Sequence, residues 1–562
     1  MSTTTQNVSQ GDEEDKRPAS STVQRALINS AAIVFIGTLL SRILGLVRAS
    51  VISWQFGQNG KTDVYNAAFT IPDVIFYLIA GGALSSSFIP VFTEYMEKKS
   101  EKEAWRLFSI IVTMTIIVVG SLILLGNLFL TPLVHAFYPK SSPEFIRQTV
   151  SLTRILLPLQ ICFFLGGLMM GALQVKKNSY GQAFGPVIYN LGIICGGVFL
   201  GRRFGIAGLC WGAVGGAVLG NLVLQWVLIR RVGGNYRPLA LFKYWGHPGA
   251  RKVWNLMWPI LLGLSLPSVC PIVNKSFASA LGDGAISALT NANFLMQVPL
   301  GIFAQAFSIA ILPMMAQQSA QDDLAGLRNT LNFGIRFILF LTIPSSIFMM
   351  TLALPIVQTL FQHGAYKAED THFAALLLIF YSIGLFAWSA QAIIARGFYS
   401  MQDSRTPVIV GTSVTVLFII GNLVALKVFG NSPENGLRTA CALAFVTSWA
   451  AILNTGILLM LLNRKLKGIH AKQLALSAGK TLLASIALGI VCYVVSLALY
   501  SRLSHFGTFL QGFGTLTICG VLGILAYLAC AFAMRMEETE MLLNMLRKVS
   551  KRSRLTGNQA SL

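Results

Sequence analysis

The chain has 562 residues, of which 54% are hydrophobic and only 11% are charged, and its mean hydropathy is +0.66. Because a soluble domain usually carries about 25% charged residues, this composition excludes a soluble enzyme. The formal net charge is +22, but the basic residues lie in short loops between apolar stretches, so they indicate membrane topology and not nucleic-acid binding.

The first 24 residues are polar and of mixed charge, and they lack the apolar core of a signal sequence. We expect them to form a disordered cytoplasmic tail. After them, apolar stretches recur at the length of about 20 residues that a helix needs to cross ~30 Å of hydrocarbon. The sequence predicts an all-α polytopic membrane protein of about fourteen transmembrane helices, at 28–56, 62–95, 105–130, 149–175, 183–201, 206–229, 253–281, 285–316, 328–353, 370–400, 406–429, 436–462, 474–500 and 508–534.

The loops alternate in charge along this series. If the N-terminus is cytoplasmic, most Lys and Arg residues outside the spans fall in cytoplasmic loops and tails, and few fall in the opposite loops. Cytoplasmic loops of membrane proteins carry an excess of Lys and Arg. Both termini are therefore predicted to be cytoplasmic.

The sequence contains a weak internal repeat. The segment around Pro90 returns near Pro313, and Gly171 and Gly397 form a second pair at nearly the same offset. An even number of helices per unit gives two lobes related by an axis along the membrane normal, a plan in which transporters hold substrate between the lobes. The expected organisation is a disordered tail (1–24), an N-terminal six-helix lobe (25–231), a cytoplasmic linker (232–252), a C-terminal six-helix lobe (253–463), two additional helices (464–534) and a basic cytoplasmic tail (535–562).

Several charges lie inside the spans, where they normally face water or a partner. Arg42 and Arg48 are about 1.7 turns apart on the first helix and can border one cavity. Asp63 and Asp73 are possible acidic partners, so Arg48 can alternatively pair with either to hold helices 1 and 2 together. Lys275 lies deep in the seventh span without an acidic residue within a turn, so we expect it to face a ligand cavity.

Basic residues outnumber acidic residues within the spans, and Arg336 in the ninth span adds to them, either as a cavity residue or as an inter-helix clamp. A site of this sign suits an anionic substrate such as a diphosphate headgroup. It argues against export of cationic drugs and against a proton relay. Candidate hinges lie where Pro or Gly interrupts helices 2 and 7, at Pro72, Gly81, Gly82, Pro267 and Pro271.

The sequence shows no enzymatic motif. Its six histidines are scattered, its eight cysteines lie singly in apolar stretches, and it has no Walker loop. We therefore expect neither catalytic residues nor a metal or cofactor, and any transport must be driven by a gradient, the membrane potential or substrate supply.

The sequence contains a set of short motifs: Ser41-Arg-Ile-Leu-Gly-Leu-Val-Arg48, Thr62-Asp63, Ile71-Pro72, Gly82-Ala83-Leu-Ser85, Phe88-Ile-Pro-Val91, Leu360-Phe-Gln-His-Gly364 and Gly397-Phe-Tyr-Ser-Met-Gln-Asp403 with Thr406-Pro407. Together they resemble the motifs of the lipid II flippases of the MurJ (MviN) type. The similarity covers about residues 28–530. It implies the multidrug/oligosaccharidyl-lipid/polysaccharide exporter superfamily and a fold of two six-helix lobes plus two additional helices.

The resemblance also implies a function in the bacterial cytoplasmic (inner) membrane. The protein would move the undecaprenyl-diphosphate-linked disaccharide-pentapeptide to the outer leaflet by alternating access, for peptidoglycan synthesis, as a monomer with this lipid-linked glycan and membrane lipids as its partners. By motif match, Arg42, Arg48 and Asp63 take the family's central-cavity positions and Arg336 matches a second-lobe arginine. The additional helices would form a groove for the lipid tail.

The sequence also departs from the family pattern. Ala49, Phe76 and the pair Asn293-Phe294 stand where the family has charged residues, and Lys275 is a candidate replacement for one missing cation. These changes keep two alternatives open. One is a flippase for another polyprenyl-diphosphate oligosaccharide, and the other is a non-transporting membrane scaffold of a cell-wall complex.

Overall fold

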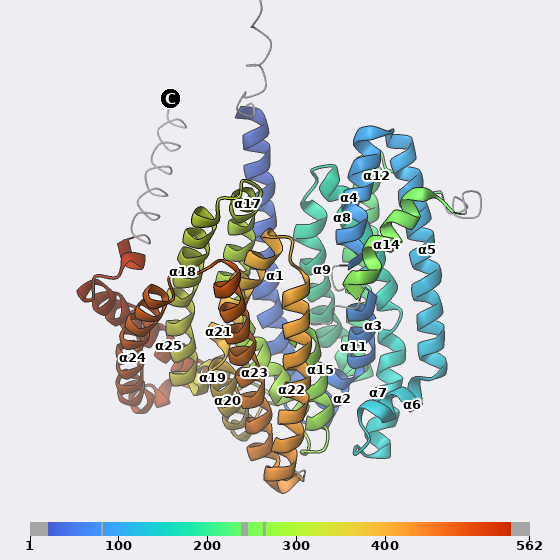
Figure 1. Ribbon diagram of the computed structural model, residues 1–562. Helices are drawn as coiled ribbons and strands as arrows, with labels where there is room; N and C mark the ends of the chain where they lie inside the picture. Colours follow the sequence, from blue (N-terminus) through green and yellow to red (C-terminus); the bar gives the residue numbers. More distant parts are fainter. Residues whose placement is uncertain (1–20, 80–82, 238–245, 262–265, 431, 541–562) are drawn as a thin grey trace, which may run out of the picture.

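The computed structural model describes residues 21–79, 83–237, 246–261, 266–430 and 432–540, which form helices without a strand (Figure 1). This confirms the all-α prediction. The first half contains α1 (Ser21–Phe56), α2 (Gly60–Ala68), α3 (Thr70–Ile79), α4 (Ala83–Lys98), α5 (Glu101–Leu128), α6 (Leu130–Phe137), α7 (Pro143–Leu156), α8 (Leu159–Val175), α9 (Tyr180–Cys195), η1 (Gly196–Leu200), α10 (Gly201–Phe204), α11 (Ala207–Ala217), η2 (Val218–Val223) and α12 (Leu224–Arg231).

The second half is also helical and ends in a separate helical pair. It contains α14 (Pro248–Leu261), α15 (Leu266–Ala278), α16 (Ala285–Pro299), η3 (Leu300–Gln305), α17 (Ala306–Ala320), α18 (Leu324–Thr351), α19 (Ala353–Phe361), α20 (Ala368–Ser382), α21 (Leu385–Ser400), α22 (Arg405–Phe429), η4 (Pro433–Asn435) and α23 (Gly436–Lys465). The final pair is α24 (Ala471–Arg502) and α25 (Thr508–Ala533), joined through η5 (Ser504–Phe506).

The number of membrane crossings fits the expected fourteen. Among the described residues, eleven helices are long and apolar enough to cross a membrane, and the pair α20 and α21, bent by 41°, makes twelve. The expected spans 62–95 and 253–281 each include residues that the structure does not describe, and their described parts are the helices α2, α3 and α4 and the helices α14 and α15.

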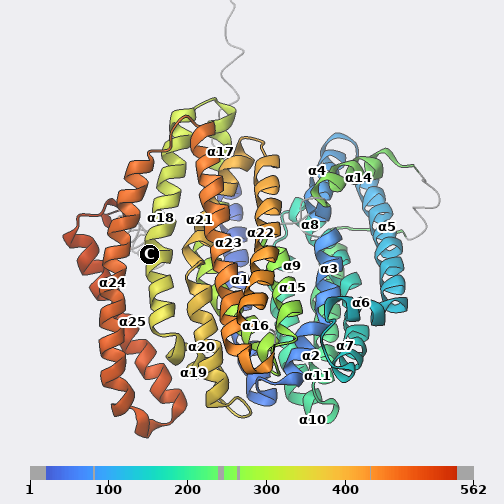
Figure 2. The same cartoon turned by 60° about the horizontal axis from the view of Figure 1, so that its bottom comes forward.

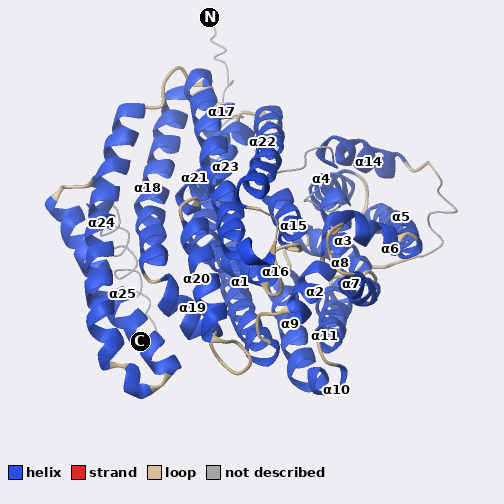
Figure 3. Ribbon diagram, turned by 90° about the horizontal axis from the view of Figure 1, so that it is seen from below, coloured by secondary structure: helices blue, strands red, loops and turns tan. Residues whose placement is uncertain are grey.

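The helices form two lobes with the additional pair at one edge. Figure 1 shows α4 to α12 on one side and α17 to α23 on the other, with α24 and α25 packed outside α18. Figures 2 and 3 place α1, α15 and α16 between the two groups. Helix α14 begins within the expected linker and extends into the expected second lobe, yet it packs against α4 and α5 of the first lobe. The predicted domain boundaries stay predictions.

A seam of small residues joins α9 to α11. A Cβ atom on Gly192 would lie 2.4 Å from the Cα atom of Gly216, and a Cβ atom on Gly212 would lie 2.4 Å from the carbonyl oxygen of Gly192. In lipid, the hydrophobic effect does not drive helices together, because the lipid tails are as apolar as the helix surface. Helices associate instead through the close packing that small residues allow. The first lobe therefore depends on glycine along this seam.

Gly212→Ala is expected to destabilise the protein by about 1–3 kcal/mol, because the added methyl group meets backbone that cannot move aside. Gly215→Ala is the matched control: it lies on the same helix, and its Cβ would meet nothing within 4 Å. Thermal unfolding of the purified protein in detergent measures both. Equal melting temperatures for the two variants would contradict the role of the seam.

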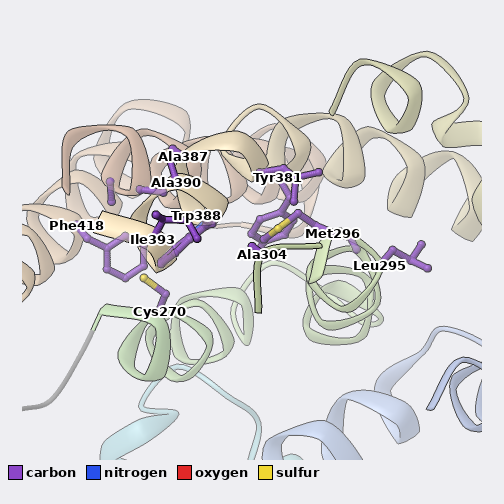
Figure 4. Packing of buried hydrophobic residues seen from close by; sticks show 14 of the residues in the cluster. Cys270, Leu295, Met296, Ala304, Tyr381, Ala387, Trp388, Ala390, Ile393 and Phe418 are labelled. Atoms are coloured by element: carbon purple, nitrogen blue, oxygen red, sulfur yellow. The ribbon is translucent and has the colours of Figure 1, made fainter. Parts of the chain in front are cut away.

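A buried polar network fixes α15 within the second lobe. The Asn274 amide donates to the Tyr381 hydroxyl at 3.1 Å and to the Thr447 hydroxyl at 2.9 Å, and Asn422 donates to the Asn274 carbonyl oxygen at 3.3 Å. Figure 4 shows Tyr381 among the apolar side chains that surround this region. Because buried polar groups are costly unless paired, the network holds Asn274, and with it α15, in one position.

Among the candidate hinges that the structure describes, Pro72 lies near a helix break, whereas Pro267 and Pro271 lie within a helix. Helix α2 ends at Ala68 and α3 begins at Thr70, two residues before the buried Pro72. Pro271 lies inside α15, and Pro267 is the second residue of that helix. Gly81 and Gly82 lie outside the described residues. Hinge motion at any of these positions stays a prediction.

Candidate functional site

A cavity of about 240 Å³ lies between the two lobes. One wall comes from α1, α2, α3 and α9, and the other comes from α15 and α16. Its charged lining residues are Arg48, Asp73 and Lys275. We call it the Lys275 cavity.

A second cavity of about 320 Å³ lies beside the first and runs along α1 toward its N-terminal half. Arg42 and Arg48 both line it, together with residues of α9 and α16. We call it the Arg42 cavity. Arg48, Tyr189 and Phe294 line both cavities, so the two adjoin at these side chains. Arg42, Arg48 and Lys275 therefore line two adjoining cavities between the lobes.

Arg42 reaches across from the first lobe to the second. A Cβ atom on Gly301 of η3 would lie 2.0 Å from the Arg42 Cζ atom, so the guanidinium rests directly on the Gly301 backbone. The Arg42 Nε atom is buried and has no hydrogen-bond partner within the described part of the chain. Since a buried donor without a partner is costly, this guanidinium has unused capacity to bind an anion.

Gly301→Ala is expected to displace Arg42 while leaving the fold intact, because the clashing atoms are the far end of a flexible side chain. Transport should fall about 10-fold, the cost of misplacing one charge-assisted contact, with an unchanged melting temperature. Gly456→Ala is the control, since its Cβ would meet nothing within 4 Å. A flipping assay with unchanged activity in Gly301→Ala would show that Arg42 does not need this position.

Asp73 pairs with Lys275 and not with Arg48. The Lys275 Nζ atom lies 3.8 Å from Asp73 Oδ2, and no ion pair joins Arg48 to Asp63 or Asp73 among the described residues. The side chains are 12% exposed for Lys275 and 39% exposed for Asp73. The alternative that Arg48 serves to clamp helices 1 and 2 through these carboxylates has no support in this arrangement.

Asp63 lies in a different environment, buried at the start of α16. Its Oδ2 atom accepts from the Gly284 N–H at 2.7 Å, and its Oδ1 atom accepts from the Ser287 N–H at 2.8 Å and the Ser287 hydroxyl at 2.6 Å. The first N–H groups of a helix have no partner within it, and the positive end of the helix dipole favours an anion there. We call Asp63, Gly284 and Ser287 the inter-lobe clasp, because α2 belongs to the first lobe and α16 to the second.

Further contacts between the lobes surround the clasp. The Asn66 amide donates to the Ser287 hydroxyl at 3.1 Å, and the Tyr366 hydroxyl donates to Gln58 Oε1 at 2.8 Å. The Ala365 N–H donates to the Trp54 carbonyl oxygen at 2.8 Å. These contacts join α2 and the end of α1 in the first lobe to the start of α16 and the loop between α19 and α20 in the second.

Arg336 lies outside both cavity linings, against the segment that follows α25. Its guanidinium donates to Glu538 Oε1 at 2.7 Å and to Glu537 Oε2 at 2.9 Å, and the Ser477 hydroxyl of α24 donates to Glu538 at 2.7 Å. Burial would raise the pKa of Glu538, but the hydrogen bonds from Ser477 and Arg336 outweigh it and lower this pKa below its usual value. These contacts fasten the additional helices to α18, the clamp role left open by the sequence, whereas substrate binding by Arg336 stays a prediction.

Two of the departures from the family pattern lie at the cavities, where they add apolar surface: Ala49 lines the Lys275 cavity and Phe294 lines both. Phe76 lines neither cavity and packs with its ring centroid 6.1 Å from those of Phe163 and Phe164. Sequence reasoning did not find Gly301, Ser287 or the Tyr366–Gln58 contact. The glycines near the two ends of α16 were the sequence signal that could have indicated these contacts. Gly284, for example, has a φ of +87°, a conformation that favours glycine.

Two helical lobes around a cationic cavity define a membrane transporter. The solved structure titled "Inward-facing conformation of a multidrug resistance MATE family transporter of the MOP superfamily" shares the fold, with a TM-score of 0.62 at 13% identity over 78% of this chain and 99% of that one. Within this class, the chain belongs to the lipid II flippase MurJ family, whose sequence model matches residues 52–511.

Individual relatives agree with this assignment. The probable lipid II flippase MurJ of Vibrio cholerae is 30% identical over 528 residues, which cover 90% of this chain and 96% of that one. The lipid II flippase MurJ of Burkholderia cenocepacia is 29% identical over 442 residues, covering 77% and 83%. The structure titled "Lipid II flippase MurJ, inward closed conformation" matches with a TM-score of 0.73 at 25% identity, over 90% of this chain and 99% of that one.

Proposed function

We propose that this protein is a lipid II flippase of the bacterial inner membrane. It moves the undecaprenyl-diphosphate-linked disaccharide-pentapeptide from the inner to the outer leaflet for peptidoglycan synthesis, by alternating access and as a monomer. The single observation that carries the proposal is the pair of adjoining cavities lined by Arg42, Arg48 and Lys275 between the lobes of a chain of this family.

The cavity cations suit the diphosphate of the substrate. A guanidinium presents parallel N–H donors that match phosphate oxygens, and in a site shielded from water such charge-assisted bonds are stronger than neutral ones. Arg42 and Arg48 lie on one helix and face one cavity, so together they can hold both phosphates. The polyprenyl chain stays in the bilayer, along the apolar surface of the additional helices.

The contacts at the clasp support alternating access. With both termini in the cytoplasm, the clasp lies at the outer end of the cavities, since α1 crosses the membrane and α2 begins at its far end. Substrate enters from the cytoplasmic side along the Arg42 cavity. Release to the outer leaflet then requires that Asp63 leave the start of α16 and that the lobes separate there.

The experiment is depletion of the protein in its host, followed by measurement of lipid II in each leaflet. The proposal expects lipid II to accumulate on the inner leaflet, and it expects the purified protein in liposomes to flip labelled lipid II. Accumulation of a different undecaprenyl-linked glycan would instead support a flippase for that oligosaccharide, which the apolar residues Ala49, Phe76 and Phe294 favour. A scaffold predicts no accumulation unless a partner enzyme is also lost.

A further inference from the structure

An ion pair joins the two lobes across the Lys275 cavity. Asp73 lies in the first turn of α3 in the first lobe, and Lys275 lies near the end of α15 in the second. Both side chains line the cavity. Of the charged residues that line the two cavities, Asp73 is the single anion.

The contact between the two charges is open. The separation of 3.8 Å between Lys275 Nζ and Asp73 Oδ2 exceeds the 2.7–2.9 Å of a close charge-assisted hydrogen bond. Asp73 is also the more exposed partner, at 39% against 12%. Because Lys275 lines the cavity, a phosphate oxygen that enters it can compete with Asp73 for the ammonium group.

Lys275 can exchange partners without movement of its helix. The preceding residue, Asn274, is held by Tyr381, Thr447 and Asn422, so α15 is fixed in the second lobe. The lysine itself carries its charge on a flexible stem with rotatable donors. The ammonium group can thus turn from Asp73 to a ligand while the backbone stays in place.

The charged side chains that line the two cavities are Arg42, Arg48, Lys275 and Asp73. The three cations exceed the one anion by two charges, which matches a diphosphate diester because that group is a dianion. A diphosphate that enters the cavity competes with the Asp73 carboxylate for the Lys275 ammonium group, because both are anions. The diphosphate offers more oxygen atoms as acceptors, so it can form shorter charge-assisted hydrogen bonds than the 3.8 Å contact with Asp73.

On the basis of the proposed function, we propose that Asp73 is a built-in counter-anion that occupies Lys275 until the substrate diphosphate displaces it. Displacement removes an ionic link between the lobes at the moment of binding. Substrate binding thereby weakens the contact between α3 and α15, next to the clasp that must open. Asp73 is a positioning residue in this scheme, and Lys275 contacts the substrate.

Binding of undecaprenyl diphosphate to the purified full-length protein in nanodiscs tests the proposal. Asp73→Asn removes the competitor and is expected to tighten binding about three- to tenfold, whereas Lys275→Gln weakens it by a similar factor. Asp73→Glu, with a longer carboxylate that can close the gap to Lys275, is expected to weaken binding. The double variant Asp73→Asn with Lys275→Gln should bind like Lys275→Gln alone, because Asp73 affects binding only by pairing with the Lys275 ammonium group.

Asp403→Asn is the matched control, since Asp403 also pairs with a lysine, Lys465, at 2.5 Å, but outside the cavities. It should leave binding unchanged. Weaker binding in Asp73→Asn, unchanged binding in both Asp73 variants, or additive effects in the double variant would overturn the inference while the proposed function stands. Failure of the wild-type protein to bind either undecaprenyl diphosphate or lipid II would overturn both.

Discussion

Arg48→Ala is expected to reduce flipping of lipid II about 100-fold, the largest loss from any single change in the cavities. Arg48 lines both cavities, so its guanidinium is placed to contact the diphosphate throughout its passage between them. Truncating one partner of a desolvated charge pair costs about 2–5 kcal/mol, and about 1.4 kcal/mol corresponds to a factor of ten. Flipping of labelled lipid II in liposomes, together with rescue of a depleted host, measures the effect.

Two further variants separate charge from geometry at this position. Arg48→Lys keeps the charge but loses the planar fork of donors, so we expect partial activity. Arg147→Ala is the control, because this arginine is exposed and pairs with Glu144 within its own helix. Arg48→Ala with wild-type flipping would remove the basis for a diphosphate site at this arginine.

Asp63→Asn is expected to shift the protein toward an outward-open state by roughly 100-fold. The wild-type carboxylate accepts hydrogen bonds from the Gly284 N–H, the Ser287 N–H and the Ser287 hydroxyl. A hydrogen bond to a charged group contributes about 1.5–3 kcal/mol. The asparagine side chain keeps one oxygen that can accept a hydrogen bond, but its NH2 group faces an N–H donor at the start of α16. The closed state therefore loses about 3 kcal/mol of stability relative to the open state. Transport falls because fewer molecules face the cytoplasm to load substrate.

Labelling from outside the cell measures this shift. A cysteine at Asn291, which lines the Lys275 cavity, should react faster with an impermeant thiol reagent in Asp63→Asn than in the wild type, with the exposed Cys195 replaced by serine in both. Asp370→Asn is the matched control, since this carboxylate caps the Lys367 N–H at 2.9 Å within a single lobe. Equal labelling in the Asp63→Asn and Asp370→Asn proteins would mean that the clasp does not hold the outer end closed.

Transport and conformation are separable in these two predictions. Arg48→Ala removes a substrate contact and should leave the labelling rate of a cysteine at Asn291 unchanged. Asp63→Asn changes the labelling rate although Asp63 does not line either cavity. A protein in which both variants change both measurements equally would point to general destabilisation, and the melting temperatures would show it.

The amino-acid sequence by itself determined the helical class, the positions of the spans and the presence of cations deep within them. Hydropathy and span length are local properties, and each helix satisfies its own backbone hydrogen bonds in lipid, so they can be read along the chain. The expectation that Arg42 and Arg48 border one cavity also needed only the helical repeat of a single helix. Lys275 was expected to face a cavity because it lies deep in the seventh span without an acidic residue within a turn, which is also a local property.

The tertiary structure alone decided which charges meet. Asp63 reaches the start of α16, 221 residues away at Gly284, Asp73 pairs with Lys275, and Arg336 pairs with Glu537 and Glu538 beyond α25. Each of these partners lies on a helix distant in sequence, and the partner is set by how whole helices pack against one another. Spacing along one chain carries no information about that packing, because many helix arrangements satisfy the same pattern of apolar spans.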